Sequence, residues 1–198
     1  MRLAAVVLAA GRSSRMGRNK LLLEVAGRTV LDRLLDAIDG STVGQIVVVL
    51  GHNPDDIIPI AEAHGTETVL NVDYDRGMTS SLITGLKRVD ADAAFLVLGD
   101  QLGLEYHLLD EMGRAMADNP LALIVSPVYE GRRGHPTLFR DSLFPEILSL
   151  GENETMKDIV VHHEPDHYEV EGDLWCTMDF DTPEDFERAV RLFEASRV

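Results

Sequence analysis

The sequence has little of several features that define other classes of protein. One cysteine in 198 residues excludes an internal disulfide framework, so we expect a reducing, cytoplasmic environment. Basic residues are also scarce, because 18 Lys and Arg stand against 34 Asp and Glu and leave a formal net charge of −16. Phosphate backbones and anionic lipids attract positive charge, so we expect no nucleic-acid and no membrane partner. Apolar runs also stay well short of the ~20 residues that a membrane span requires.

The rest of the composition is that of a folded globular protein. Hydrophobic residues make up 45% and charged residues 26% of the chain, proportions that exclude a disordered chain. A chain of this length buries a sizeable core, and no repeat or low-complexity linker divides it. We therefore predict a single domain over residues 1–198.

Strand-like apolar segments alternate with amphipathic helical segments over most of the chain. Residues 3–10 have the composition of a short signal peptide, but their β-branched centre and the Gly11 that follows favour a buried parallel strand. Further strands are expected at residues 45–50, 67–71, 93–98 and 121–128, and helices at 30–38, 54–63, 80–88 and 106–117. This alternation predicts an α/β fold with a mostly parallel sheet and helices on both faces.

Capping signals and short apolar segments describe the remaining elements. Asn53 and Pro54 are expected to begin the helix at 54–63, and Thr182 and Pro183 the closing helix. Residues 137–139 and 175–180 are expected to form short strands, and residues 142–150 and 155–162 to form helices.

Charge is distributed unevenly along the chain. Residues 1–20 hold five basic side chains and no acid, whereas residues 151–198 hold 14 acids and four bases. The loop after the first strand contains Gly11 and Gly17, which allow unusual backbone dihedrals, and Arg15 and Lys20, which can grip phosphate oxygens. It lacks the spacing of a dinucleotide fingerprint or a Walker A loop. It therefore indicates either a phosphate site of another type or an ordinary basic surface loop.

Five segments, taken in order, resemble the signature of nucleotidyltransferases related to molybdenum cofactor cytidylyltransferase. Residues 8–20 match L-A-A-G-x-S-x-R-M-G-x-x-K in full, and residues 77–82 match G-M-x-x-S-L. Residues 133–136 read R-G-H-P and residues 179–183 read D-x-D-T-P. The family's G-D-Q-P corresponds to residues 99–102, with Leu102 in place of the proline. The segments span nearly the whole chain, so the resemblance is specific.

The resemblance implies a Rossmann-like three-layer α/β/α fold of the GT-A-like nucleotidyltransferase type. It also implies transfer of a nucleoside monophosphate from an NTP to a phosphorylated acceptor, with Arg15, Lys20 and Asp100 as catalytic residues. The nucleotide would be bound by residues of the first loop and of three later segments: Leu8, Ala9, Ala10, Gly11, Arg15, Lys20, Asn71, Met78, Ser80, Ser81 and Gly99. For Ser80 and Ser81, an ordinary helix-capping role is nearly as well supported.

Acidic residues supply candidate ligands for Mg²⁺, which prefers oxygen donors. Asp100 directly follows the apolar run 93–98, so it is expected at the carboxyl end of a central strand. Asp179 and Asp181 alternate on the expected strand at 175–180 and its continuation, and only one of them need face the metal. The alternative for Asp181 is a capping role ahead of Thr182.

The resemblance places acceptor-binding residues at Gln101, Gly134 and His135. His135 also fits a purely structural turn, because it lies between Gly134 and Pro136. Leu102 alters the loop beside the metal site but removes no chemical group.

The identity of the substrates follows from two smaller features. Ala9 and Ala10 are typical of cytidylyl members, whereas guanylyl members carry a glycine there, so we predict CTP and molybdopterin, with a client molybdoenzyme as a possible partner. The alternatives are guanylyl transfer to molybdopterin, transfer to a sugar phosphate or methylerythritol phosphate, and a non-catalytic pterin-cofactor carrier. The R-G-H-P segment argues against the sugar and erythritol acceptors.

A histidine-rich segment and the cysteine are interpreted as structural. His162, His163 and His167, with Glu164 and Asp166, lack a clear metal-ligand spacing and are expected on a solvated face. Cys176 follows Trp175 and is expected to be a buried apolar residue.

Overall fold

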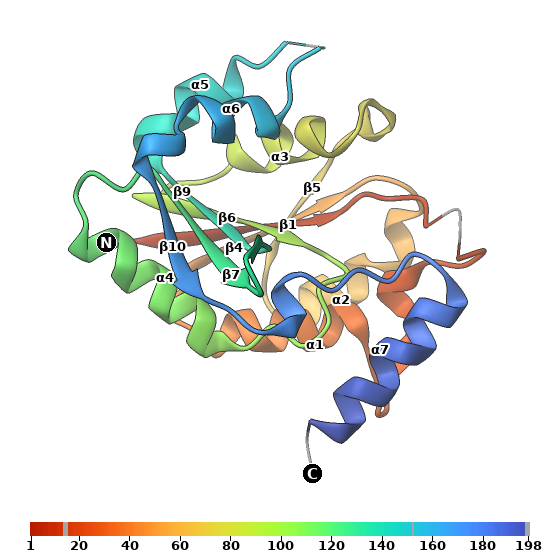
Figure 1. Cartoon of the computed structure of the whole chain (residues 1–198). Helices are drawn as coiled ribbons and strands as arrows, with labels where there is room; N and C mark the ends of the chain where they lie inside the picture. The colour runs from red at the N-terminus through yellow and green to blue at the C-terminus, as the bar shows by residue number, and fades with distance from the viewer. Residues whose placement is uncertain (14–15, 152, 197–198) are drawn as a thin grey trace.

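A computed structural model describes residues 1–13, 16–151 and 153–196. One eight-stranded sheet runs through the molecule in the order β10-β7-β9-β6-β1-β4-β5, with β8 paired to β7 at the side (Figure 1). Its strands are β1 Leu3–Ala9, β4 Gln45–Leu50, β5 Glu67–Leu70, β6 Ala93–Leu98, β7 Ile124–Tyr129, β8 Arg132–Arg133, β9 Thr137–Arg140 and β10 His167–Glu171. The prediction of a mostly parallel sheet is confirmed, because only β8 and β9 run against their neighbours.

The first strand is the centre of the sheet. All but one residue of β1 are buried, because β4 and β6 flank it in parallel and helices cover both of its faces. Val6 lies opposite Val47 on one side and Leu96 on the other. A run of apolar residues with no polar alternation is what a strand buried on both faces requires, so the prediction of a buried strand here is confirmed.

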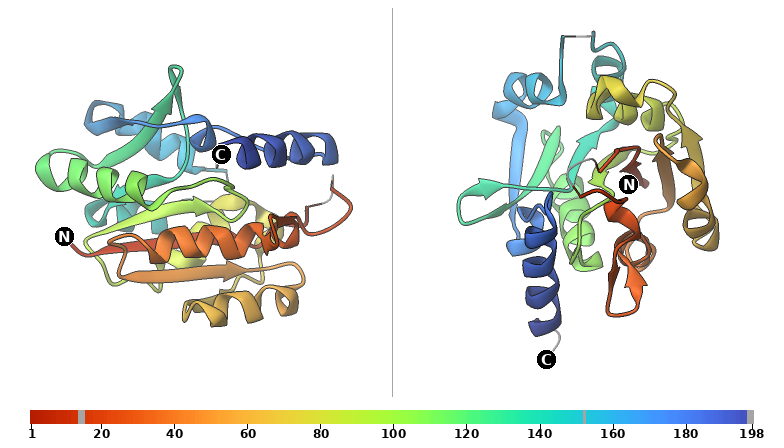
Figure 2. Two further views of the ribbon diagram at one scale, coloured as in Figure 1. Left: turned by 90° about the horizontal axis from the view of Figure 1, so that it is seen from below. Right: turned by 90° about the vertical axis from the view of Figure 1, so that its right-hand side faces the viewer.

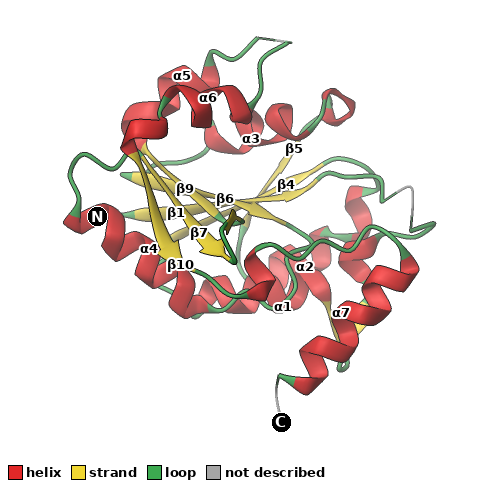
Figure 3. Ribbon diagram, viewed as in Figure 1, coloured by secondary structure: helices red, strands yellow, loops and turns green. Residues whose placement is uncertain are grey.

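Helices cover both faces of the sheet, as Figure 3 shows by colour. On one face lie α1 Val30–Asp39, α2 Ile58–Ala63 and α4 Tyr106–Asp118, and on the other lie α3 Met78–Leu86, α5 Phe144–Leu148 and α6 Met156–His162. Alternate residues of β1 supply the two cores: Leu3 and Val7 pack with the first set of helices, and Ala4 and Val6 with the second. The predicted three-layer α/β/α fold is confirmed.

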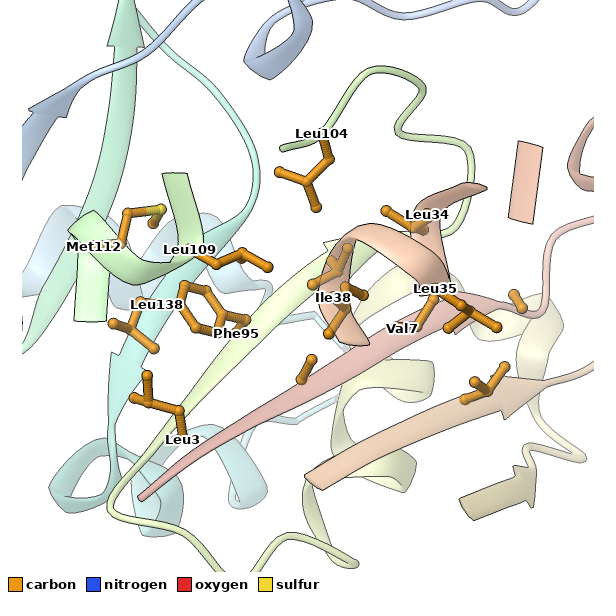
Figure 4. Close-up of a cluster of buried hydrophobic side chains, with 14 of the residues drawn as sticks. Leu3, Val7, Leu34, Leu35, Ile38, Phe95, Leu104, Leu109, Met112 and Leu138 are labelled. Carbon is orange, nitrogen blue, oxygen red and sulfur yellow. The ribbon is translucent and has the colours of Figure 1, made fainter. Parts of the chain in front are cut away.

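The larger core lies between the sheet and helices α1, α2 and α4. Leu35 and Ile38 of α1 point toward Val7 of β1 in Figure 4, and Phe95 of β6 lies near Leu109 of α4. Each of these side chains is fully buried. Burial of a large apolar side chain stabilises the folded state by about 1.5–3 kcal/mol, so the packing of these helices on the sheet contributes much of the stability of the fold.

A third apolar cluster lies beside the carboxyl edge of the sheet. It joins α7 Pro183–Ala195 to the hairpin formed by β2 Glu24–Val25 and β3 Arg28–Thr29. Phe186 and Phe193 of α7 pack there with Trp175 and Leu102. Figure 2 shows α7 (dark blue) at the same end of the molecule as the loop that follows β1, with the N-terminus at the other end.

Two expectations about the local structure are wrong. Residues 175–180 do not form a strand, because the Asp173 carboxylate accepts a hydrogen bond from the Trp175 amide at 2.9 Å and starts the 3₁₀ turn Leu174–Cys176. The edge strand next to β7 is β10, which precedes this segment in the sequence. Asn53 does not cap its helix through its side chain, since it has a left-handed φ of 49° and precedes the 3₁₀ turn Pro54–Asp56.

None of the helices in the described part of the chain combines the length and the apolar character that crossing a membrane requires.

Candidate active site

A cavity of about 410 Å³ opens at the carboxyl edge of β1 and β6. Most of its lining residues belong to segments that the sequence predicts to bind nucleotide: Leu8, Ala10, Gly11, Lys20, Met78, Ser81, Gly99 and Asp100. The strands place them together because the carboxyl ends of parallel strands meet at one edge of a sheet. Among the described residues, the predicted set is therefore largely brought to one cavity, with the exceptions of Ala9, Asn71 and Ser80.

Close packing of the backbone shapes the floor of the cavity. The Gly99 amide donates a hydrogen bond to the Leu8 carbonyl at 3.0 Å, and a Cβ on Gly99 would lie only 2.6 Å from that oxygen. Ala10 lines the cavity, whereas the Ala9 side chain packs into the larger core on the other side of the strand. Ala9 is thus placed to contribute through its backbone alone.

Lys20 connects the two predicted metal-binding segments. It begins the 3₁₀ helix Lys20–Leu22, and its ammonium contacts the carboxylates of both Asp100 and Asp181. The distance from Lys20 Nζ to Asp181 Oδ1 is 3.1 Å. The sequence predicted a basic loop and an acidic pair at this edge, and the structure joins them in one cluster.

The electrostatics of this cluster keep Lys20 charged. Burial opposes the ammonium, but the carboxylates of Asp100 and Asp181 outweigh burial and raise the pKa of Lys20. The Lys20 backbone amide also donates to Ser13 Oγ at 3.1 Å, which ties the residue to the preceding loop. A fixed positive charge beside a cavity of this size is suited to an anionic ligand.

Asp179 and Asp181 occupy different surroundings. Asp181 contacts Lys20, whereas Asp179 is exposed and its charge acts on His135. Burial lowers the pKa of the His135 imidazole, and the carboxylates of Asp179 and Asp100 act in the opposite direction without cancelling it. His135 is consequently neutral at pH 7, and its buried Nδ1 has no hydrogen-bond partner among the described residues.

The three predicted acceptor-binding residues form one connected corner. The Gln101 side-chain amide donates to the backbone carbonyl of His135, and Gln101 Oε1 is buried without a partner among the described residues. The His135 amide donates to the Cys176 carbonyl at 2.7 Å, and a Cβ on Gly134 would lie 2.0 Å from the same oxygen. Gly134 is therefore required for packing.

Leu102 and Cys176 complete the wall behind this corner. The Leu102 amide donates to the Asp100 carbonyl at 2.9 Å, a bond that a proline at this position could not make, and the leucine side chain is buried. Burial raises the pKa of the Cys176 thiol to about 11, so the predicted role of an apolar filler is confirmed by its placement. A second, smaller cavity of about 180 Å³ lies next to this wall and is lined in part by Gln101, Trp175 and Cys176.

The N-terminus of α3 forms the opposite wall of the first cavity. Gly77 precedes α3 with a φ of 98°, a conformation that favours glycine, and the half-exposed Met78 follows it. Ser81 lines the cavity. The buried Asn71 amide donates to both Ser80 Oγ and Ser81 Oγ at 3.0 Å, and Ser80 lines a neighbouring cavity instead. Asn71 and Ser80 are thus placed to hold the helix terminus.

Three further residues at the cavity, Arg12, Tyr74 and Asp75, have no role predicted from the sequence. The Arg12 guanidinium makes a double hydrogen bond with the Asp75 carboxylate at 2.9 and 2.6 Å and lies 5.5 Å from the centre of the Tyr74 ring. All three residues line the cavity. Arg12 stands inside the basic loop, but its partner lies far along the chain, so only the charge of Arg12 was visible in the sequence.

The basic residues of the N-terminal segment do not form one patch. Arg2 lies at the opposite edge of the sheet and pairs with Asp90 and Asp92, while Arg12 is neutralised by Asp75. Arg15, predicted to be catalytic, lies outside the described residues. Among the described basic residues of this segment, Lys20 lines the cavity and Arg2 lies far from it.

The expectation of a solvated histidine-rich face is correct for His162 and Glu164 but not for His163 and His167. His167 is buried and its Nε2 lies 2.9 Å from Ser126 Oγ, while the largely buried His163 contacts Glu146. These two rings are buried because α6 packs on the sheet and β10 pairs with β7, which the acidic composition did not reveal.

Residues 5–167 match the sequence model of a protein family, the MobA-like NTP transferase domain. Nicotine blue oxidoreductase of Paenarthrobacter nicotinovorans is 31% identical over 172 residues, which cover 81% of each protein. Molybdenum cofactor cytidylyltransferase of Escherichia coli (strain K12) is 26% identical over 184 residues, 91% of this chain and 92% of that protein.

Solved structures agree with this match. The crystal structure of Rv0371c from Mycobacterium tuberculosis H37Rv has a TM-score of 0.84 and 30% identity, and the match covers 96% of this chain and 98% of that one. A structure of Rv0371c in complex with manganese has a TM-score of 0.80 and 27% identity, with coverage of 96% and 99%. The order of the strands, the cavity at their carboxyl edge and these matches lead to one conclusion: the chain belongs to the MobA-like NTP transferase family.

Proposed function

We propose that the protein transfers CMP from CTP to the terminal phosphate of molybdopterin and releases pyrophosphate. The observation that carries the proposal is the cluster of Lys20, Asp100 and Asp181 beside a cavity that holds most of the predicted nucleotide-binding residues. The E. coli relative, named a molybdenum cofactor cytidylyltransferase, supports the choice of substrates.

The reaction needs positioning and charge neutralisation more than a strong base. An oxygen of the acceptor's phosphate forms a bond to the α-phosphorus of CTP, and the bond from that phosphorus to the bridging α–β oxygen breaks. The bonding electrons leave with pyrophosphate. A phosphate monoester is ionised near neutral pH, so no proton has to be removed from the nucleophile. Lys20, with Arg15, stabilises the charge that develops on the leaving group.

The acidic pair fits a divalent cation. Asp100 and Asp181 already share one cation, the Lys20 ammonium, and their carboxylate oxygens are the donors that Mg²⁺ and Mn²⁺ prefer. When bound, such an ion neutralises charge on the nucleotide's phosphates. Asp179 is the weaker candidate ligand, because it is exposed and its charge acts on His135. The manganese complex of Rv0371c supports a metal-dependent reaction.

The acceptor binds on the Gln101 side of the cluster. Gln101 fixes the loop that contains Gly134 and His135, and the buried Nδ1 of the neutral His135 and Oε1 of Gln101 are available to a polar acceptor group. Asp179 lies on this side as well. The pterin, which carries many donors and acceptors, satisfies such buried groups.

Ala10 is the residue that selects the base. Its methyl group lines the nucleotide cavity, whereas the Ala9 methyl group is buried in the core, so only Ala10 narrows the space at the base. We expect Ala10→Gly to lower the preference for CTP over GTP by about tenfold, which corresponds to the ~1–3 kcal/mol that one methyl group contributes in a pocket. The measurement is kcat/KM for each nucleotide, with Ala9→Gly as the matched control.

The experiment that tests the proposal is pyrophosphate release with each of four NTPs, with and without molybdopterin and with a sugar phosphate or methylerythritol phosphate in its place. We expect release only with CTP and molybdopterin together. Preference for GTP would establish guanylyl transfer, and release with another acceptor would overturn the acceptor. No release with any pair would favour a non-catalytic pterin carrier.

A further inference from the structure

Two helices on the α3 face of the sheet bring a carboxylate and two imidazoles together. Glu146 lies on α5, and His162 and His163 lie at the C-terminal end of α6. His163 Nε2 is 2.8 Å from Glu146 Oε2, and His162 Nδ1 is 3.5 Å from Glu146 Oε1. One donor atom of each residue falls within 4.8 Å of the other two. The three side chains therefore converge on one point.

The separations match those of a metal's ligands. A tetrahedral zinc site with bonds of about 2.0–2.1 Å holds its ligand atoms about 3.3 Å apart. The two imidazole–carboxylate distances, 3.5 and 2.8 Å, lie on either side of that value. The rings of His162 and His163 are stacked, with an interplanar angle of 12°. A ring nitrogen binds a metal in the plane of its ring, so one of the two rings must turn out of the stack for both to bind the same ion; His162, whose side chain is 74% exposed, is free to do so.

The backbone holds these ligands in place. Ile147, next to Glu146, and Ile159, one turn before His163, are both buried in the core under α5 and α6. The His163 amide donates to the Ile159 carbonyl at 3.0 Å and extends the helical turn past His162. Neighbouring residues on a regular helix face different directions, so it is this end of the helix that lets consecutive histidines meet one carboxylate.

We propose that Glu146, His162 and His163 bind a divalent transition-metal ion of the zinc class, at a site separate from the candidate active site. Imidazole nitrogens favour Zn²⁺, Ni²⁺ and Cu²⁺ over Mg²⁺, so the ion differs from the one proposed for Asp100 and Asp181. Three protein ligands leave a fourth position for water, because His162 is 74% exposed. The ion ties α5 to the end of α6 and stabilises the folded chain.

The test is a calorimetric titration of the whole protein with Zn²⁺, in excess Mg²⁺ so that the acidic pair at Lys20 is occupied. We expect the parent protein to bind one equivalent of Zn²⁺. The affinity for Zn²⁺ should fall by more than about tenfold in each of His162→Gln, His163→Gln and Glu146→Gln. His107→Gln is the control, since it removes another exposed histidine. Cys176 does not compete, because burial raises the pKa of its thiol to about 11.

Thermal denaturation supplies the second readout. Zn²⁺ raises the Tm of the parent protein but not that of His162→Gln, whose exposed position makes it the variant least able to disturb the fold. Parent-like zinc affinity and Tm shift in His162→Gln and His163→Gln would overturn the proposal. Asp100→Asn retains the zinc response, so failure of the proposed transferase activity and failure of this site are distinguishable.

Discussion

The two ends of β1 carry similar ion clusters in different surroundings. At the amino end, Arg2 pairs with Asp90 and Asp92; at the carboxyl end, Lys20 joins Asp100 and Asp181. The Arg2 and Asp90 side chains are 63% and 90% exposed, whereas those of Lys20 and Asp100 are 20% and 17% exposed. Water screens the first cluster, and the protein confines the second beside a cavity.

This difference separates a surface feature from a site. Exposed ion pairs contribute little, because water and salt screen them. A half-buried ammonium between two carboxylates is retained at a desolvation cost, so its position is suited to chemistry rather than to stability. Variants of equal chemical change at the two ends of β1 should therefore have very different effects on activity.

The largest effect is expected from Asp100→Asn. The substitution keeps the shape of the side chain but removes the charge that contacts Lys20 and that we propose binds a divalent cation, so kcat should fall by about 1,000-fold. Pyrophosphate release measures it, and Asp92→Asn at the amino end is the matched control with parent-like turnover. Near-normal turnover of Asp100→Asn in a folded protein would remove Asp100 from the reaction.

Lys20→Ala is expected to follow, with kcat/KM for CTP lowered by about 100-fold. In the proposed reaction the Lys20 ammonium contacts the phosphates, so its loss should weaken both phosphate binding and stabilisation of the leaving group. Arg2→Ala removes a basic side chain at the other end of the strand and should leave kcat/KM unchanged. Equal losses in both variants would mean that overall charge, rather than position, controls the rate.

Comparison of Asp181→Asn with Asp179→Asn sharpens the description of the carboxyl end. Of these two residues, Asp181 is the one that contacts Lys20, so its variant should need about tenfold more Mg²⁺ for half-maximal activity. Asp179→Asn should mainly change KM for the acceptor, because its carboxylate acts on His135. If the two variants exchanged these phenotypes, Asp179 would be the metal ligand.

The smallest effect is on stability at alkaline pH. Asp100 and Asp181 raise the pKa of Lys20 against the opposing effect of burial, so the charged form is stabilised in the folded state. That contribution is complete below the unfolded pKa of ~10.4 and is lost as pH rises through the higher folded value. As the pH rises through the folded pKa of Lys20, the Tm of the parent should therefore fall relative to the Tm of Lys20→Met. The difference between parent and Arg2→Met should stay constant, because guanidinium keeps its proton.

The layers of this fold can be predicted from the sequence, because a strand that is buried on both faces is an uninterrupted run of apolar residues. β1 and β6 are uninterrupted apolar runs, and Gly99 and Asp100 follow β6 at the edge where ligands bind. The elements that were wrongly predicted depend on the local conformation of single residues. The turn at Leu174–Cys176 forms because Asp173 caps it, and no periodicity records that.

Site residues could be predicted where they belong to one local sequence motif. Contacts between residues of two segments far apart in the sequence could not. Lys20 and Asp100 were each identified from local pattern, although their contact was not. The Arg12–Asp75 pair and the Asn71–Ser80 bond join residues whose separation in sequence hides them. Glu146 likewise meets His162 and His163 only because α5 and α6 pack together.

A structure of the protein with CTP and Mg²⁺ tests the central claim most directly. We predict that the triphosphate lies in the cavity between Gly11 and the N-terminus of α3, with Lys20 on a phosphate oxygen and the ion on Asp100 and Asp181. A nucleotide bound at another edge of the sheet, or an ion that touches neither carboxylate, would contradict the assignment of the carboxyl end of β1 as the active site.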